Sequence, residues 1–143
     1  MRILIDTNVL LDIVLRREPF FKASQAVVAA CQQEFFDGAI SAQTIADMFY
    51  ILRKVFDKTA RQKTLLGFCK IFHVASVDER KIISALENED FHDFEDCLQA
   101  ECAKDFLAAY IITRNGKHFA HSPIPAITPE EFCSRYLEKE NGA

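Results

Sequence analysis

Three aspartates occupy positions where an α/β protein can build a catalytic site. Asp6 directly follows a short apolar run, Asp47 lies in a stretch of helical periodicity, and Asp96 begins a later helical stretch. Carboxylates that converge raise one another's pKa, and a divalent cation relieves their repulsion. Mg²⁺ and Mn²⁺ prefer oxygen ligands, and a bound metal can activate water and neutralise charge on a phosphate. We therefore treat the three aspartates as candidate metal ligands.

Each of these acids also has a structural interpretation. Asp6 could cap the helix that follows it, although a carboxylate directly after a buried strand favours a functional role. Asp47 could lie on a solvated helix face, and its spacing alone favours that alternative. Asp93 is better interpreted as a helix N-cap, whereas for Asp96 a favourable helix-dipole position and a metal-binding role are compatible.

Other polar residues carry weaker signals. Arg114 and Lys117 flank a turn after a predicted strand and could contact phosphate, although isolated basic residues are usually surface residues. The chain has no GxGxxG, GKS/T or GxSxG motif, so nucleotide-binding and serine-hydrolase functions have no support. The four histidines lack metal-ligand spacing, and we interpret them as non-ligands: His73, His92, His118 and His121.

The elements that must position the acids alternate between strands and helices. Residues 2–5 are predicted to form a strand buried on both faces, and Asn8 is expected to cap the helix that follows. Ser41 is expected to cap the helix that carries Asp47, and Thr128 with Pro129 indicates the start of the last helix. Further strands are predicted over residues 39–40, 72–77 and 110–113, an extended segment over 122–125, and helices over about 9–15, 19–30, 41–56, 59–71, 78–86, 94–107 and 128–140.

This alternation predicts an α/β fold with three layers, in which a central parallel sheet lies between helices. The 143 residues are half hydrophobic, which suits one domain over residues 1–143. The carboxyl ends of parallel strands form the usual ligand site of such a sheet, and Asp6 falls at one of these ends.

Composition excludes several classes of protein. A net charge of −4 argues against a DNA-coating protein, whose surface is basic. Five scattered cysteines without a CxxC pair favour reduced thiols in the cytoplasm and offer no zinc pattern. Asp6 interrupts the first apolar run, which therefore predicts neither a signal peptide nor a membrane span.

Four segments, taken in order, resemble the motifs of the PIN domain family, and they extend over almost the whole chain. The last of them continues through Phe119 into an ending that is also similar to the family. These segments are residues 1–12 (MRILIDTNVLLD), 41–53 (SAQTIADMFYILR), 93–99 (DFEDCLQ) and 110–115 (YIITRN), with 122–132 (SPIPAITPEEF) as the ending.

The resemblance implies a metal-dependent endoribonuclease of the VapC-like toxin branch, with Mg²⁺ or Mn²⁺ as cofactor. It also implies an RNA substrate, an antitoxin protein that blocks the cleft, a homodimer and no association with membranes. Asp6 matches the family's first acid, Asn8 its neighbour and Asp96 the third acid, and Thr7 lies in the same turn as Asp6. Asp47 falls where the family usually has Glu.

The fourth acidic position departs from the family pattern. Asn115 stands where many members have Asp, and the alternative positions for that acid hold His118 and Ala109. Two functions therefore stay open: a ribonuclease, and a PIN module that binds RNA or a partner protein without catalysis. For the ribonuclease, the expected catalytic residues are Asp6, Asp47, Asp96 and Asn115, the expected metal ligands are Asp6, Asp47 and Asp96, and supporting roles are expected for Thr7, Asn8, Asp93 and Arg114.

Overall fold

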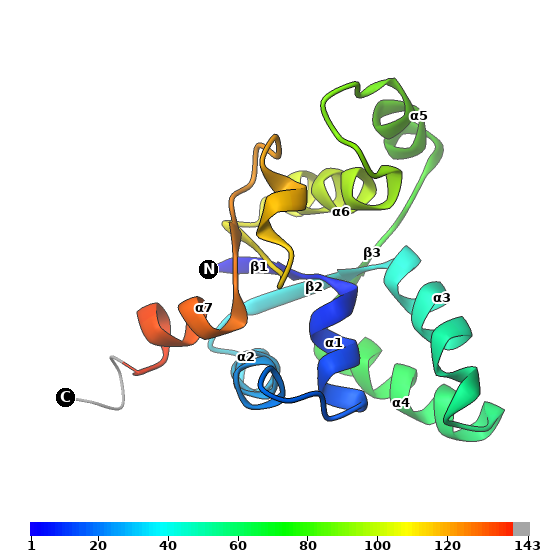
Figure 1. Cartoon of the computed structure of the whole chain (residues 1–143), viewed down its shortest axis with the longest axis vertical. Helices are drawn as coiled ribbons and strands as arrows, with labels where there is room; N and C mark the ends of the chain where they lie inside the picture. Colours follow the sequence, from blue (N-terminus) through cyan, green and yellow to red (C-terminus); the bar gives the residue numbers. More distant parts are fainter. Residues whose placement is uncertain (139–143) are drawn as a thin grey trace.

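The structure is a computed structural model that describes residues 1–138, and its centre is a parallel β-sheet (Figure 1). The strands lie in the order β3-β2-β1-β4-β5, and every neighbouring pair is parallel. The strands are β1 (Arg2–Ile5), β2 (Asp37–Ser41), β3 (His73–Ala75), β4 (Tyr110–Ile112) and β5 (Ala126–Ile127).

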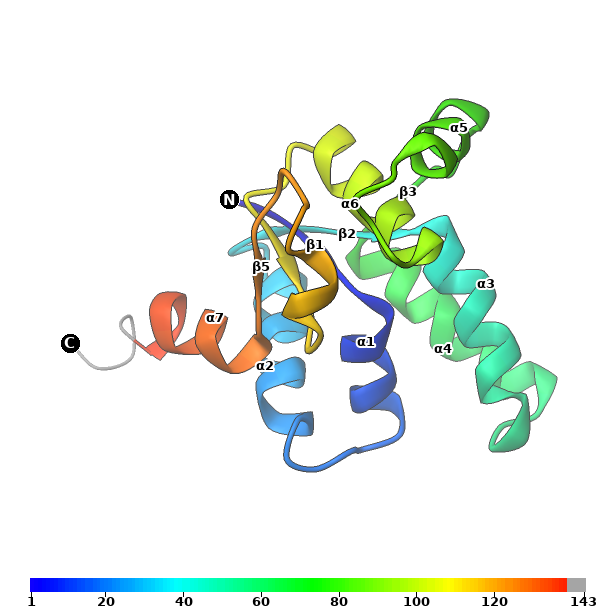
Figure 2. The ribbon, with the colours of Figure 1, turned by 45° about the horizontal axis from the view of Figure 1, so that its top comes forward.

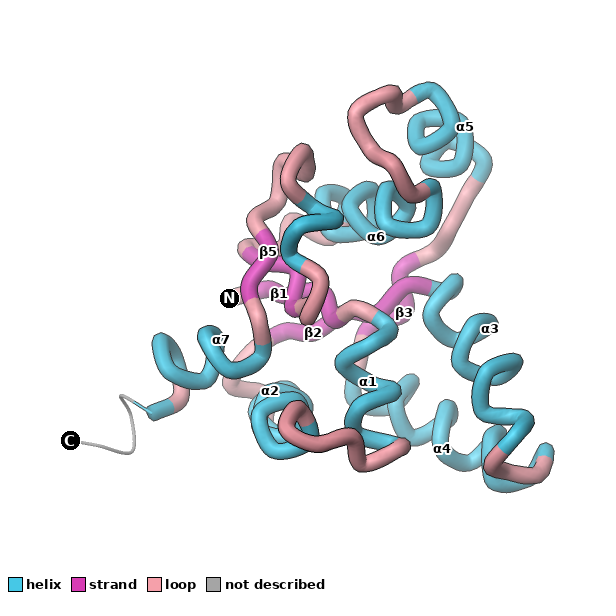
Figure 3. The backbone as a smooth tube through the Cα atoms, in the orientation of Figure 1, coloured by secondary structure: helices cyan, strands magenta, loops and turns pink. Residues whose placement is uncertain are grey.

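Helices cover both faces of this sheet, so the predicted three-layer α/β/α class is confirmed (Figure 3). One face packs against α1, α2, α3, α4 and α7, while the other packs against α6, with α5 beside α6. The α-helices are α1 (Thr7–Val14), α2 (Phe21–Gln32), α3 (Ala42–Ile51), α4 (Lys58–Ile71), α5 (Glu79–Glu87), α6 (Phe94–Asp105) and α7 (Pro129–Tyr136); the 3₁₀ helices are η1 (Leu52–Lys54) and η2 (Gly116–Phe119). Within residues 1–138 no helix is long and apolar enough to cross a membrane.

The central strands bury both of their faces, as their continuous apolar sequences predict. Along β1, Ile3 and Ile5 enter the core beneath α1 and α2, whereas Leu4 enters the core beneath α6. The same alternation places Ile112 and Ile111 of β4 on opposite faces. The sheet is therefore held from both sides, and the ends of β1 and β4 are fixed relative to each other.

The strand order reverses between β1 and β4, because the chain continues from β1 to β2 on one side and returns later to place β4 on the other. In open α/β sheets the crevice at such a switch point, beyond the carboxyl ends of the strands, is where ligands bind. The backbone N–H of Asp6 donates to the carbonyl oxygen of Ile112 at 2.9 Å. Asp6 therefore lies at the point where the two central strands, β1 and β4, end side by side.

Local capping signals predicted three helix starts correctly. Ser41, Asp93 and Thr128 cap α3, α6 and α7, each accepting a hydrogen bond from the backbone N–H three residues later. The expected Asn8 cap is wrong: α1 begins at Thr7, because the carboxylate of Asp6 accepts from the backbone N–H of Thr7. Pro19 was expected to open the second helix, but α2 begins at Phe21.

Other expectations from the sequence differ from the structure. The helix expected over 41–56 ends its α-helical part at Ile51 and continues as η1. Leu66 and Cys69 of α4 are exposed, because α4 turns Leu65 and Phe68 towards the core. Strand β5 was not expected; it directly follows the extended segment that was expected over residues 122–125. The predicted end of the last helix near Glu140 lies outside the described residues. Figure 2 shows β5 leading into α7.

Gly38 has a packing role inside β2. A Cβ at this position would lie 2.7 Å from Cδ1 of Phe72 and 2.9 Å from Sγ of Cys31. Those groups are buried and belong to the core that supports the sheet. Gly67 on α4 differs, since a Cβ there would meet nothing within 4 Å.

We expect Gly38→Ala to lower the free energy of unfolding by about 1–3 kcal/mol, because the added methyl group overpacks the core. The matched control Gly67→Ala should raise it by about 0.5–1 kcal/mol, because alanine is the better helix former. Urea denaturation of the two variants and the parent measures both effects. Equal effects of the two substitutions would contradict the packing role of Gly38.

Candidate active site

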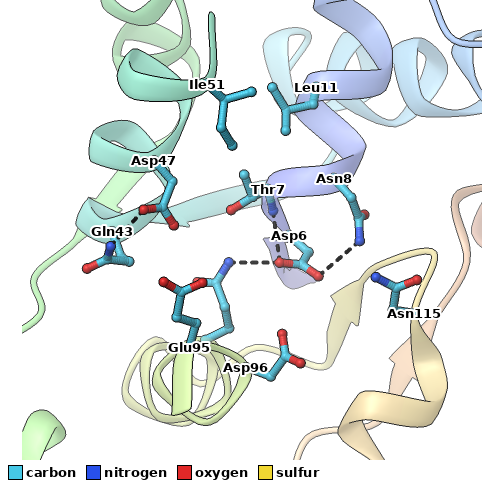
Figure 4. A pocket seen from close by; sticks show the side chains of 11 residues that line it. Asp6, Thr7, Asn8, Leu11, Gln43, Asp47, Ile51, Glu95, Asp96 and Asn115 are labelled. Atoms are coloured by element: carbon cyan, nitrogen blue, oxygen red, sulfur yellow. Dashed lines mark hydrogen bonds between the residues drawn. The ribbon is translucent and has the colours of Figure 1, made fainter. Parts of the chain in front are cut away.

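A pocket of about 240 Å³ opens at the carboxyl ends of β1 and β4, where the strand order reverses (Figure 4). It brings together all four predicted catalytic residues, together with Thr7 and Asn8. Asp93 and Arg114 are outside it. The pocket is lined by Asp6, Thr7, Asn8, Leu11, Gln43, Asp47, Ile51, Glu95, Asp96, Gln99 and Asn115.

Each acid reaches this pocket from a different, well-anchored element. Asp6 lies at the junction of β1 and α1, and Asp47 lies on α3, which Ser41 caps directly after β2. Asp96 lies in the first turn of α6, and its backbone N–H donates to the carboxylate of Asp93 at 3.0 Å. The cap interpretation of Asp93 is therefore confirmed, and the strand ends and helix caps together fix where the acids meet.

The carboxylate of Asp6 is only 6% exposed and is held by four donors. Its Oδ1 accepts from the backbone N–H of Thr7 and from Nε2 of Gln99, both at 2.9 Å. Its Oδ2 accepts from Oγ1 of Thr113 at 2.7 Å, with Nδ2 of Asn8 at 3.4 Å. These bonds fix the carboxylate in one orientation and compensate part of the cost of burying its charge.

A buried polar network extends from Asp6 towards α3. The amide of Gln99 also donates to Oγ1 of Thr44 at 3.1 Å, and Thr44 in turn contacts Oγ1 of Thr7 at 2.9 Å. Sequence reasoning missed Gln99, Thr44 and Thr113 as site residues. Weak signals pointed to two of them: Gln99 is three residues after Asp96 on the same helix face, and Thr113 directly follows a strand as Asp6 does.

A fourth carboxylate, that of Glu95, lines the pocket beside Asp47 and was also missed from the sequence. The negative charge of Asp47 is the largest cause that raises the pKa of Glu95, followed by burial and by the charge of Asp93. Asp47 itself accepts a hydrogen bond at 2.9 Å from Nε2 of Gln43, one turn earlier on α3. Glu95 thus brings the number of carboxylates that line the pocket to four, although position 115 holds a neutral amide.

The surroundings of Asp96 raise the pKa of its carboxyl group strongly. Burial, followed by the charges of Asp93 and Asp6, raises its pKa to about 6, although His118 opposes the shift. Nδ1 of His118 lies 3.0 Å from Oδ2 of Asp96. His118 had been assigned no role from the sequence, yet it contacts a predicted metal ligand from the wall of a second cavity, about 470 Å³ in volume, which also includes Asp93 and Lys117.

The donors in the pocket suit a hard divalent cation. All the acids offer carboxylate oxygens, and Oε1 of Gln99 is buried without a hydrogen-bond partner. Among residues 1–138, no three His, Cys, Asp or Glu side chains are grouped closely enough to hold a metal ion unaided. Mg²⁺ commonly binds through one or two carboxylates plus water and substrate phosphate, so this more open arrangement fits it.

Arg114 turns away from the pocket and binds a buried acid. Its guanidinium donates to both carboxylate oxygens of Asp12 on α1, with Nη2 at 3.1 Å from Oδ1. Asp12 is fully buried, and Arg17 adds a second contact at 3.6 Å. The guanidinium also stacks 4.2 Å from the ring centre of Phe20. This ion pair ties α1 to the loop that carries Thr113, a role that sequence reasoning did not assign to Asp12.

The chain is similar to known proteins over most of its length. The family model described as PIN domain matches residues 2–117. Ribonuclease VapC1 of Aquifex aeolicus (strain VF5) is 30% identical over 138 residues, which cover 94% of this chain and 95% of that protein.

Solved structures also share the fold. A toxin–antitoxin complex from Klebsiella pneumoniae contains a chain with a TM-score of 0.65 and 24% identity, over 88% of this chain and 96% of its own length. VapBC2 from Rickettsia felis, bound to a DNA fragment from their promoter, gives a TM-score of 0.63 and 18% identity, over 90% and 98%. At these identities the two likenesses establish the fold alone.

We expect Asp12→Asn to lower the free energy of unfolding by about 3 kcal/mol, because it leaves the partly buried charge of Arg114 without its counter-ion. The control Glu131→Gln removes one partner of an exposed ion pair with Arg135 and should change stability by less than about 0.5 kcal/mol. Chemical denaturation of both variants measures the difference. Similar small effects would show that the Asp12–Arg114 pair contributes no more than a surface pair.

Asp96 should make the metal-free protein less stable as pH rises. Its pKa is about 6 in the folded protein against an ordinary value of 3.8, so folding favours its protonated form. That contribution is complete below about pH 4 and is lost as pH rises through about 6.

In chelator, Asp96→Asn should therefore unfold with a free energy about 1–2 kcal/mol higher than the parent at pH 8, and the gain should shrink towards pH 5. Denaturation at several pH values measures this gain, and Glu89→Gln, an exposed change outside the pocket, serves as the control. A gain that does not depend on pH would contradict the electrostatic cause.

Proposed function

The chain belongs to the PIN domain family, and we propose that it is a metal-dependent endoribonuclease of the VapC-like toxin type, which hydrolyses RNA phosphodiester bonds. The observation that carries this proposal is the convergence of Asp6, Asp47, Glu95 and Asp96 on one pocket at the switch point of the sheet. Its 30% identity with Ribonuclease VapC1 over 94% of the chain supports the same activity.

The proposed cofactor is Mg²⁺ or Mn²⁺; of the proposed ligands Asp6, Asp47 and Asp96, one or two would bind it directly and the remainder through water. The all-oxygen donors and the unpartnered Oε1 of Gln99 support this choice of hard cation. When bound, such a cation neutralises charge on the scissile phosphate and activates a water molecule. Glu95 supplies a further carboxylate beside Asp47, which keeps the site strongly anionic despite Asn115.

The residues of the pocket would divide the remaining work. Asp6 keeps one fixed orientation because Thr7, Gln99 and Thr113 hold it. Asn115, exposed on the loop after β4, can donate or accept a hydrogen bond at a phosphate or a water molecule.

His118 would orient Asp96 in the pocket. Its Nδ1 lies 3.0 Å from Oδ2 of Asp96, so the imidazole contacts one carboxylate oxygen. In the metal-free protein, burial raises the pKa of Asp96 to about 6, and a bound cation would favour the ionised carboxylate that a metal ligand requires.

A second candidate function is a PIN module that binds RNA or a partner protein without catalysis. The neutral side chain of Asn115 favours this alternative, as does the lack of an acid at positions 109 and 118. Glu95 weighs against it, because four carboxylates still line the pocket.

We also propose an antitoxin protein as partner and a homodimer as the working assembly, with residues 1–143 forming one domain. The similar structure from Klebsiella pneumoniae supports the antitoxin, since it is a toxin–antitoxin complex. The proposed location is the cytoplasm, which five free cysteines also favour. Four of the five are buried, as small core residues are expected to be, whereas Cys69 is exposed.

The test is cleavage of single-stranded RNA by purified protein with Mn²⁺ and with chelator. We expect metal-dependent cleavage by the parent and a loss of at least about 100-fold in Asp6→Asn, because removing its charge weakens the metal site. Asp37→Asn makes the same chemical change at the opposite end of a strand and should keep full activity.

Thermal unfolding of the same proteins adds a measurement that does not depend on knowing the RNA target. Mn²⁺ should raise the melting temperature of the parent and of Asp37→Asn, but not that of Asp6→Asn. If Mn²⁺ stabilised none of the three and no RNA were cut, the non-catalytic alternative would replace the ribonuclease.

A further inference from the structure

One helical hairpin carries a clear excess of basic over acidic residues. Residues 48–77 contain six Lys or Arg and one acid, Asp57, which gives this segment a formal charge of +5. The whole chain carries −4, so the remainder carries −9. We call residues 50–63 the basic hairpin; they comprise the end of α3, η1 and the first part of α4, where the two helices meet away from the sheet (Figure 1).

The cations of the basic hairpin are available to a ligand. Within residues 1–138, none of them forms a salt bridge with a carboxylate, and most are exposed. The single local acid, Asp57, caps α4 by accepting from the backbone N–H of Ala60 at 2.8 Å. The cations are Arg53, Lys54, Lys58, Arg61 and Lys63.

Aromatic rings fix two of these guanidinium groups. Arg53 lies 3.6 Å from the ring centre of Tyr50, which is 63% exposed, and donates to the carbonyl oxygen of Tyr50 at 2.7 Å. Arg61 lies 4.2 Å from the ring centre of Phe49. Exposed aromatic and guanidinium planes among unpaired cations are the groups that single-stranded RNA uses for stacking and phosphate contacts, which favours RNA over an acidic peptide.

The basic hairpin continues the wall of the acidic pocket. Gln43, Asp47 and Ile51 line the pocket at spacings of four residues along α3, and Figure 4 shows Asp47 and Ile51 on that wall. Tyr50 and Lys54 follow Asp47 by three and seven residues, which places them on or near the same helix face. A rise of about 1.5 Å per residue as far as Ile51 and of about 2 Å per residue through η1 puts Lys54 about 12 Å beyond Asp47 along the axis.

We infer that the basic hairpin is the surface that binds the backbone of the RNA strand whose scissile phosphate enters the pocket. This inference rests on the proposed function. A pocket lined by four carboxylates repels a polyanion, and a neighbouring cationic surface offsets that repulsion. The exposed ring of Tyr50, supported by Arg53, offers a stacking site for a base next to the bound phosphates.

The experiment measures the affinity of a labelled single-stranded RNA by fluorescence anisotropy in chelator, so that no cleavage occurs. We expect the double variant Lys54→Gln/Lys58→Gln to raise the Kd roughly 5- to 20-fold at low salt and to reduce the slope of log Kd against log salt by about 1.4 for two lost phosphate contacts. The control Lys22→Gln/Lys104→Gln removes the same charge from exposed positions on α2 and α6 and should change the Kd less than about twofold.

Three results separate the interpretations. An unchanged salt slope in Lys54→Gln/Lys58→Gln, or an equal loss in the control, overturns the inference. Unchanged RNA affinity with weaker binding of a poly-aspartate peptide also overturns it, and assigns the surface to an acidic protein partner. If the parent binds RNA through the basic hairpin but cuts none with Mn²⁺, the surface stands and only the ribonuclease proposal fails.

Discussion

The burial of one carboxylate, that of Asp6, is the constraint on which the rest of the structure depends. A buried charge is tolerated only where donors surround it, and the donors here come from α1, from α6 through Gln99 and from the end of β4 through Thr113. Each of these elements must therefore end or begin at the same point. The reversal of strand order between β1 and β4 provides that point, so the topology and the site satisfy a single requirement.

The clustered acids of the pocket lower the stability of the folded chain. Burial and neighbouring acids raise the pKa of Asp96 and Glu95, which means that the folded chain holds these charges at a cost. The apolar core on both faces of the sheet offsets that cost. Such strain is typical of functional sites, where an arrangement suited to a ligand is unfavourable without it.

Local chemistry made much of this structure predictable. Apolar runs identified the central strands, and side-chain caps such as Ser41 and Thr128 identified helix starts, because both depend on residues close in sequence. Asp6, Asp47 and Asp96 were predictable from strand ends and from a family resemblance, whereas Glu95 was not. The partners of the buried acids were not predictable either, since Gln99 is 93 residues from Asp6 and Arg114 is 102 from Asp12. Strand β5 has only two residues, too few for a periodic signal.

Glu95 and Asp96 are neighbours in one helical turn, yet they serve opposite sides of the pocket, because Glu95 interacts with Asp47 and Asp96 with Asp6. The separation within each pair therefore depends on the position of a single rigid body, α6. That helix packs against α5 on its outer side and shares no core with α1 to α4. A displacement of α6 would change both pairs in the same movement, and Gln99, which donates from this helix to Asp6 and to Thr44, opposes such a displacement.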